Sequence, residues 1–160
     1  MFKIGDYITH PMHGAGVIES IVTKKINGSQ RDYYLLKLPV GDMVVMVPVS
    51  GCEDIGVRSI ISRSEAEKLF SAFSEIEISM TQNWNKRYRE NMDKIKSGNL
   101  LDVASVVKGL MCRDSERGLS TSERKMLHSA KQILISELVI ATDMDYDGVE
   151  KRLCAALKEG

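Results

Sequence analysis

Hydrophobic residues follow two different spacings in the two parts of the chain. Up to about residue 50 they occur in short runs rich in β-branched and aromatic residues, near Tyr7–Thr9, Gly16–Ile26, Tyr33–Leu38 and Met43–Val49. Asn27-Gly28 separates the second and third runs and favours a two-residue hairpin turn. Pro39–Asp42 predicts the next turn, and the last run stops near Pro48. Because so small a sheet must curl to bury a core, we expect a small β-barrel of the Tudor or SH3 type.

From Ser64 onward the apolar residues repeat at helical spacing. Ser64–Glu67 and Ser120–Glu123 both have the spacing of a capping box, in which a hydroxyl and a carboxylate satisfy each other's backbone N–H groups. The predicted helices cover about 64–73, 81–97, 99–113, 120–140 and 149–158. The third is apolar nearly all round and is expected in the middle of a bundle. The sequence therefore predicts an α+β protein, with a β-domain at residues 1–55 and an all-α domain of about five helices at 56–160.

Charge is balanced overall but uneven along the chain. Twenty-two basic and 22 acidic residues cancel. Residues 81–96 hold five basic and two acidic residues, and 108–131 hold six and three. Residues 132–160 reverse the balance, with three basic and six acidic. This distribution indicates a positioned basic patch rather than a general affinity for polyanions.

The cysteines and the N-terminal sequence bear on the compartment. Cys52, Cys112 and Cys154 form no CxxC unit, which favours a reducing cytoplasm and packing or surface roles for all three. Asp6 precedes any long apolar run, and the chain has no stretch of 18 apolar residues. We therefore expect neither a signal peptide nor a membrane span.

One acidic motif resembles half of a metal site. Asp143–Gly148 matches the first half of a calcium-binding EF-hand loop. A complete loop needs a bidentate glutamate at its twelfth position, which here is Cys154. The carboxylates fit better at a helix N-terminus, where they cap free N–H groups and complement the dipole.

Two further motifs lie around the first predicted turn. His10 and His13 could ligate zinc, but no cysteine or third histidine lies nearby to complete a tetrahedral set. They are expected to be turn residues with ring hydrogen bonds. Gly14-Ala15-Gly16 lacks the third glycine and the following helix of a dinucleotide-binding loop, so it predicts a tight bend between strands.

The segment Asn83–Arg89 carries the strongest candidate chemistry. It holds the single tryptophan, Trp84, and three basic residues, Lys86, Arg87 and Arg89, near the start of a predicted helix. Periodicity groups Trp84 with Tyr88, Met92 and Ile95, which favours a core stripe beside a solvated basic flank. The alternative is that Trp84, in the first turn, escapes the core and wedges between bases while the basic residues hold phosphates.

A second basic group brackets the start of the 120–140 helix. It comprises Arg113, Arg117, Arg124 and Lys125. A helix start with exposed N–H groups and basic side chains suits phosphate, although a solvated face explains the same pattern equally well.

The chain has no GxSxG or HExxH motif and no cysteine beside a histidine. We expect no catalytic residues, no metal and no cofactor.

Taken together and in order, several short segments resemble the CarD/CdnL family of bacterial transcription regulators over essentially the full length. These segments are Phe2–Asp6, His10–Gly14, Val47-Pro48, Gly56–Arg58, Asn83–Tyr88, Arg117–Ser120 and Glu123–Leu127. The N-terminal part also resembles the polymerase-interacting module of the transcription–repair coupling factor. The resemblance implies a Tudor-like domain that binds the RNA polymerase β subunit and a helical domain that contacts promoter DNA at the upstream edge of the bubble.

The resemblance also implies roles for individual residues. Trp84 matches the family's tryptophan, which inserts at the minor groove and props the bubble open. Lys86 and Arg87 match its basic companions, and Arg124 and Lys125 match a second basic pair near the DNA.

Polymerase contacts are implied in the β-domain. Lys24 lies where the family often has a basic residue in the contacting strand, and Met46-Val47-Pro48 ends another strand. Met46 replaces the arginine of some members, although an apolar residue there is also found in the family. The exposed edge near Met43–Val47 could extend a partner's sheet.

The expected function is therefore a cytoplasmic transcription adaptor, associated with the nucleoid through RNA polymerase, that stabilises the open complex without reading sequence. We expect no membrane partner and no small-molecule substrate. The alternative is a β-barrel RNA-binding module with a helical dimerisation domain, acting in translation or RNA handling. Its barrel would need aromatic and basic residues on one sheet face, and the candidates are Tyr33, Tyr34, Lys24, Lys25 and Arg31.

Overall fold

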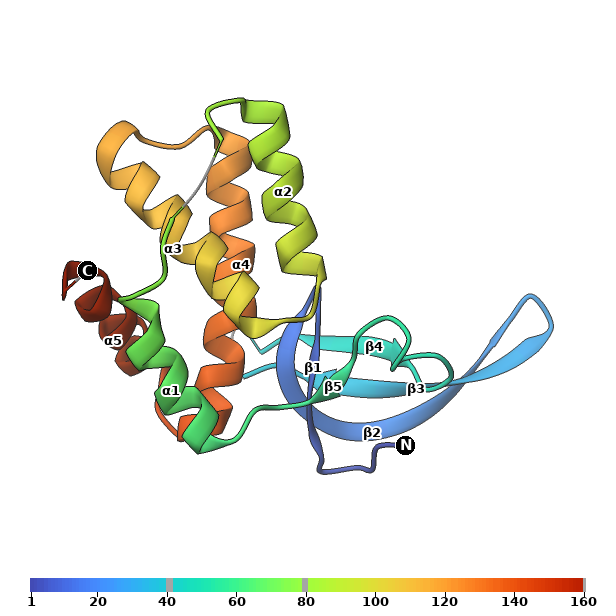
Figure 1. Cartoon of the computed structure of the whole chain (residues 1–160). Coiled ribbons are helices and arrows are strands. Elements are labelled where there is room, and N and C mark those ends of the chain that lie inside the picture. Colours follow the sequence, from blue (N-terminus) through green and yellow to red (C-terminus); the bar gives the residue numbers. More distant parts are fainter. Residues whose placement is uncertain (40–41, 79–80, 160) are drawn as a thin grey trace.

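The β-part is one antiparallel sheet. A computed structural model describes residues 1–39, 42–78 and 81–159. Its strands are β1 (Tyr7–His10), β2 (Gly14–Ile26), β3 (Ser29–Lys37), β4 (Val44–Pro48) and β5 (Arg58–Ser59). They lie in the order β4-β3-β2-β1-β5. The β2–β3 hairpin turns at Asn27 and Gly28, which both have positive φ as the sequence predicts, and it projects far from the helices (Figure 1). The predicted turn at 39–42 includes residues 40 and 41, which lie outside the described residues.

The expectation of a closed barrel is wrong, although the α+β class is confirmed. In the part of the chain that the structure describes, β4 pairs with β3 alone and β5 with β1 alone, so the sheet is open. The sheet does not need to close on itself because other segments cover its core. Cys52 and Val57, from the turns before β5, pack on Ile8, Ile18 and the other buried residues of the sheet. The predicted division between residues 55 and 56 stays a prediction, and the last strand lies just beyond it.

Five helices follow the sheet, as predicted. They are α1 (Arg63–Phe73), α2 (Trp84–Lys96), α3 (Leu100–Arg117), α4 (Thr121–Thr142) and α5 (Tyr146–Glu159). The capping box of α1 is formed by Ser62 and Glu65, two residues before the predicted one. The third helix continues to Arg117, past its predicted end, so the loop before α4 is shorter than expected. No helix of the described residues is long and apolar enough to cross a membrane.

The helical core surrounds α3, as the all-round apolar pattern predicts. Val103, Val106, Val107 and Leu110 of α3 are buried in it. Lys108 lies among them and is also buried. Its ammonium donates to the carbonyl oxygens of Ser74 (2.9 Å) and Ile76 (2.8 Å) just after α1. A cation there satisfies free carbonyls and complements the helix dipole, so Lys108 is a structural residue and not part of a basic surface.

The sheet and the helices meet along α4. Figure 1 shows α4 running through the helical domain to the strands β1 and β2. The Ser136 hydroxyl of α4 accepts a hydrogen bond from the Ala15 N–H (2.8 Å) at the start of β2. Gly14 permits this approach, because a Cβ there would lie 2.5 Å from Ser136 Oγ. The bend predicted at Gly14–Gly16 lies instead at residues 11–13, because Gly14, Ala15 and Gly16 begin β2 and pair with β1. This start of β2 is the point where the helix contacts the sheet.

Replacement of Gly14 by alanine should lower the free energy of unfolding by about 3 kcal/mol, measured by denaturant titration. Its φ of +95° strains any L side chain, and the added methyl group would collide with Ser136. Gly28→Ala is the control, since Gly28 has φ +80° but a Cβ added there would have nothing within 4 Å. This control should lose only about 1 kcal/mol from backbone strain. Equal losses in the two variants would contradict the proposed contact with α4.

Candidate nucleic-acid interface

Trp84 opens α2 and lies against the start of α4. Asn83 caps α2 by accepting from the Lys86 N–H (3.0 Å), so Trp84 is the first helical residue. The indole ring stacks on Tyr88, with centroids 5.3 Å apart, and its N–H donates to the Ser120 hydroxyl (3.3 Å). Its side chain is nevertheless 42% exposed. Of the predicted core stripe, Ile95 is buried and Tyr88 and Met92 pack against the core, whereas Trp84 is held at the surface.

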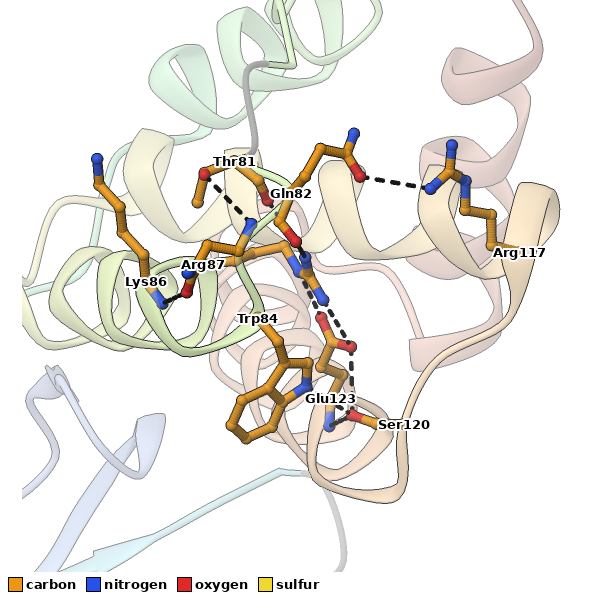
Figure 2. A network of polar contacts seen from close by, with 9 residues as sticks. Thr81, Gln82, Trp84, Lys86, Arg87, Arg117, Ser120 and Glu123 are labelled. Atoms are coloured by element: carbon orange, nitrogen blue, oxygen red, sulfur yellow. Dashed lines mark hydrogen bonds and ion pairs between the residues drawn. The ribbon is translucent and has the colours of Figure 1, made fainter.

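Arg87 follows Trp84 by three residues on the same face of α2, but it does not face solvent. Its side chain is 2% exposed and pairs with Glu123 of α4, which is 3% exposed (Figure 2). Nε and the second terminal nitrogen donate to the two carboxylate oxygens at 2.9 and 3.3 Å. The remaining nitrogen donates to the carbonyl oxygens of Thr81 and Gln82, both at 3.2 Å. All three nitrogens have partners, so Arg87 is placed to fix α2 on α4 rather than to bind a phosphate.

Glu123 carries the other half of this pair. Burial alone would raise the pKa of its carboxyl, but the hydrogen bonds and charge of Arg87, the Ser120 hydroxyl and the nearby Arg113 outweigh that effect and lower it. Ser120 caps α4 as predicted, by accepting from the Glu123 N–H (3.2 Å). The Glu123 carboxylate differs from the prediction, because it accepts from Arg87 and the Ser120 hydroxyl. Ser120 and Glu123 thus join the cap of α4, the buried pair and the indole.

The other predicted DNA-binding residues are exposed to solvent. Lys86 and Arg89 on α2, and Arg124 and Lys125 in the first turns of α4, are all exposed. Since the indole contacts Ser120, the two helix starts that carry these cations lie side by side. Arg117, at the end of α3, donates to the Gln82 side chain (3.3 Å) in the same region (Figure 2). The structure therefore brings four exposed cations and one exposed aromatic ring onto two neighbouring helix starts, although Lys86 projects away from the ring (Figure 2).

The β-sheet separates the predicted polymerase contacts by face. Lys24 lies opposite Arg31, and Met46 lies opposite Leu35, which puts Lys24 and Met46 on the same side of the sheet. Val47 points the other way and is fully buried in the core. Its side chain is therefore not available to a partner, while those of Lys24 and Met46 are exposed.

Within the described residues, strand β4 is an edge strand that pairs with β3 alone, so that its outward main-chain groups have no partner strand. The Val49 N–H donates to Asp32 and the Leu38 N–H to Met43, which fixes the alternation of the ladder. In that alternation the N–H and C=O groups of Val44 and Met46 point away from β3. Pro48 also lies on this outward register and has no N–H to donate, a usual position for proline in an edge strand. One side of β4 can therefore accept another strand.

The motifs that resembled metal or nucleotide sites have structural roles. Asp145 Oδ1 accepts from the Gly148 N–H (2.7 Å) at the start of α5, which confirms the helix-cap interpretation. His10 Nδ1 accepts from the Met12 N–H (3.0 Å), as expected of a turn residue. Burial, followed by the neighbouring His13, lowers the pKa of His10. The three cysteines are free, with Cys52 buried and the other two half-buried.

Sequence reasoning missed the buried partners that orient the site. The capping spacing predicts only a capping role for Glu123, and no motif singles out Glu137. Glu137 lies within the apolar run Ile133–Val139, where a charged residue is a signal of a buried ion pair. Its partner is Arg58, which cannot be found from helical or strand spacing because it lies 79 residues away in the sequence.

The fold and the site define a protein with an open sheet edge in one part and an exposed tryptophan among cations in the other. The family model of the CarD-like/TRCF RID domain matches residues 2–61, and that of the CarD C-terminal domain matches residues 68–154. Both parts thus match domains of RNA polymerase-interacting transcription regulators. The Bacillus subtilis (strain 168) protein named "Putative transcription factor YdeB" is 38% identical over 140 residues, which cover 88% of this chain and 92% of that protein. The chain belongs to the CarD family, as the resemblance predicted.

Substitution of Glu123 by glutamine should lower the free energy of unfolding by roughly 3 kcal/mol at neutral pH, because it leaves the buried Arg87 guanidinium without its counter-charge. The folded-state pKa of Glu123 is lowered, so the stabilisation is complete above the ordinary glutamate pKa of 4.5 and is lost as the pH falls below it. Unfolding titrations from neutral to acid pH should therefore show a smaller difference between variant and wild type at low pH.

Glu67→Gln is the matched control for this measurement. Glu67 forms a similar two-pronged pair with Arg152, at 2.8 and 3.0 Å, but at the surface. A solvated pair contributes little, so its loss should be much smaller than that of Glu123→Gln. Equal losses at neutral pH would mean that burial of the Arg87–Glu123 pair does not increase its contribution to the free energy of unfolding.

Proposed function

We propose that this protein binds the β subunit of RNA polymerase through its sheet and contacts promoter DNA around Trp84, at the upstream edge of the transcription bubble. It stabilises the open complex and reads no base sequence. Binding to polymerase would place it on the nucleoid. The observation that carries the proposal is the exposed indole of Trp84, held by Tyr88 and Ser120 beside exposed cations.

The position of Trp84 suits a wedge. An aromatic ring that enters a base step must be partly free of its own core and yet fixed in direction. Stacking on Tyr88 and the hydrogen bond to Ser120 hold the ring, and 42% of the side chain remains accessible. Unstacking a base step costs a few kcal/mol, and a wedge that binds only the opened form offsets part of this cost.

The surrounding cations suit the DNA backbone. Lys86, Arg89, Arg124 and Lys125 are exposed and can pair with phosphates, which carry no sequence information. Arg87 is left out of this contact set, because its nitrogens are bonded within the protein. Its proposed role is to hold the start of α2 against α4, which fixes the direction of Trp84.

The sheet offers a mode of attachment to polymerase. The free side of β4 can accept a strand through the main-chain groups of Val44 and Met46. Lys24 and Met46 add side chains on the exposed face, and Pro48 borders the same edge. Val47 contributes only by packing in the core. Attachment raises the local concentration of DNA, so that the DNA-facing residues need little affinity of their own.

The RNA-binding alternative is less well supported. It requires exposed aromatic rings on one face of the sheet, and Tyr34, one of its two candidates, is fully buried. Tyr33 is half-buried on the other face. Recovery of RNA or ribosomes without polymerase in a pull-down with the purified protein would favour this alternative.

Trp84→Ala should shorten the lifetime of the open complex at a weak promoter by roughly tenfold, because the wedge supplies part of a cost of a few kcal/mol. The lifetime is measured after addition of a competitor that traps free polymerase. Trp84→Phe keeps a ring without the bond to Ser120 and should have an intermediate effect. An unchanged lifetime in a folded Trp84→Ala protein that still binds polymerase would refute the wedge.

Met46→Pro should weaken binding to an isolated polymerase β fragment by about fivefold, since one outward N–H is lost and such a bond contributes about 1 kcal/mol. That N–H points away from β3, so the sheet itself should remain intact. Met46→Ala removes the side chain but keeps the N–H and should bind more tightly than Met46→Pro. Equal affinities of the two variants, measured by calorimetry, would argue against strand addition.

A further inference from the structure

A buried carboxylate in the C-terminal part of α4 joins the sheet to the helices. Glu137 is fully buried, and its two oxygens accept from the Arg58 guanidinium at 2.7 and 3.1 Å. One of them also accepts from the Ile61 N–H (2.8 Å) in the segment that leads to α1. Burying a charge in this way is expensive in desolvation, so such a pair is better explained by the geometry that it fixes than by added stability.

Arg58 extends this junction to a third segment. It lies in β5, and its Nε donates to the Gly98 carbonyl oxygen (3.2 Å) in the turn between α2 and α3. A single carboxylate thus connects the last strand, the segment before α1 and the turn that ends α2. Next to it, Ser136 accepts from the Ala15 N–H of β2. Ala15 and Arg58 flank the same residue of β1, Thr9. The sheet is therefore attached to α4 at two neighbouring residues.

The same helix holds the proposed DNA contact at its other end. Ser120 and Glu123, at the start of α4, hold the Trp84 indole and the Arg87 guanidinium. Seventeen residues separate Ser120 from Glu137, which corresponds to about 25 Å along a helix. No glycine or proline interrupts Thr121–Thr142. Helix α4 therefore runs without a break from its contacts with the sheet to its contact with Trp84.

We propose that Glu137 is a positioning residue for the open-complex activity, and that its clamp on Arg58 fixes the direction of Trp84 relative to the polymerase-bound sheet. This inference rests on the proposed function. A rigid connection keeps Trp84 at the DNA once the sheet is bound, whereas a loose one spreads it over many positions and lowers its effective concentration there. Loss of the clamp should therefore weaken the DNA effect without weakening polymerase binding.

The first measurement follows the clamp directly. Spin labels are attached at Glu19→Cys on β2 and Lys94→Cys on α2, both exposed, after replacement of the native cysteines by alanine. Glu137→Gln should broaden the distance distribution between the labels in the full-length protein. Glu67→Gln, which alters a two-pronged arginine pair within the helical domain, should leave it narrow. A distribution as narrow as that of the wild type in Glu137→Gln would overturn the proposal.

The second measurement follows the function. Glu137→Gln should shorten the open-complex lifetime by roughly tenfold, through lost effective concentration, and leave the affinity for the polymerase β fragment unchanged. Glu67→Gln should alter neither. A broadened distribution together with a wild-type lifetime would also overturn the proposal. If Trp84→Ala leaves the lifetime unchanged, the proposed function fails, whereas the distances still decide whether Glu137 holds the two parts together.

Arg58→Gln provides an independent test if Glu137→Gln folds poorly. This variant breaks the Arg58–Glu137 pair by changing Arg58, the member that is partly exposed. It keeps the bond from the Ile61 N–H to Glu137. The distribution should broaden here too. Arg58→Gln removes the pair with Glu137 and also the bond to the Gly98 carbonyl oxygen, so the Arg58→Gln, Glu137→Gln double variant should be no broader than Arg58→Gln alone. Additive broadening would show that the two residues act separately and would contradict the clamp.

Discussion

The buried pair between Arg87 and Glu123 is the interaction on which the proposed DNA surface depends. It joins two helices whose starts would otherwise be free to separate, and it does so beside the residue that opens each helix. Each member also bonds to its own helix start. Arg87 donates to the carbonyl oxygens just before α2, and Glu123 accepts from the hydroxyl of Ser120, the cap residue of α4. The exposed indole and the exposed cations are therefore arranged by a charge pair that itself faces no solvent. Removing either partner would disturb both helix starts together.

Helix α4 relates this surface to the rest of the molecule. Polar contacts of α4 occur at its first turn, at Lys131, which pairs with Glu150 of α5, and again at Ser136 and Glu137. The apolar residues between them pack in the bundle core. A polar contact is directional, whereas apolar packing alone tolerates small rotations of a helix on a sheet. Hydrogen bonds at both ends therefore give the two parts of a CarD-family protein one defined arrangement. Gly14 contributes to this arrangement by allowing the sheet to approach the helix closely.

Local patterns in the sequence predicted most of the elements, because hairpins and helices depend on neighbouring residues. Asn27-Gly28 identified the hairpin, and apolar spacing identified all five helices. Closure of the sheet was predicted wrongly, because the residues that cover its core, such as Cys52 and Val57, lie in turns without periodicity. Arg87 was grouped with Lys86 because adjacent basic residues look alike in sequence. On a helix, the side chains of consecutive residues point in directions about 100° apart. Arg87 therefore faces Glu123, while Lys86 faces solvent.

Four of the five predicted DNA-contacting cations remain exposed once Arg87 is recognised as internal. The number matters for the response to ionic strength, since each phosphate that a protein neutralises releases condensed counterions from DNA. The logarithm of affinity for duplex DNA falls with the logarithm of salt concentration by about 0.9 per contact, so four contacts give a slope of roughly −4 at most. This is a mild dependence compared with proteins that bind DNA on their own charge. If the proposed delivery by polymerase holds, such a surface would act over a wide range of salt and have little tendency to occupy bare DNA.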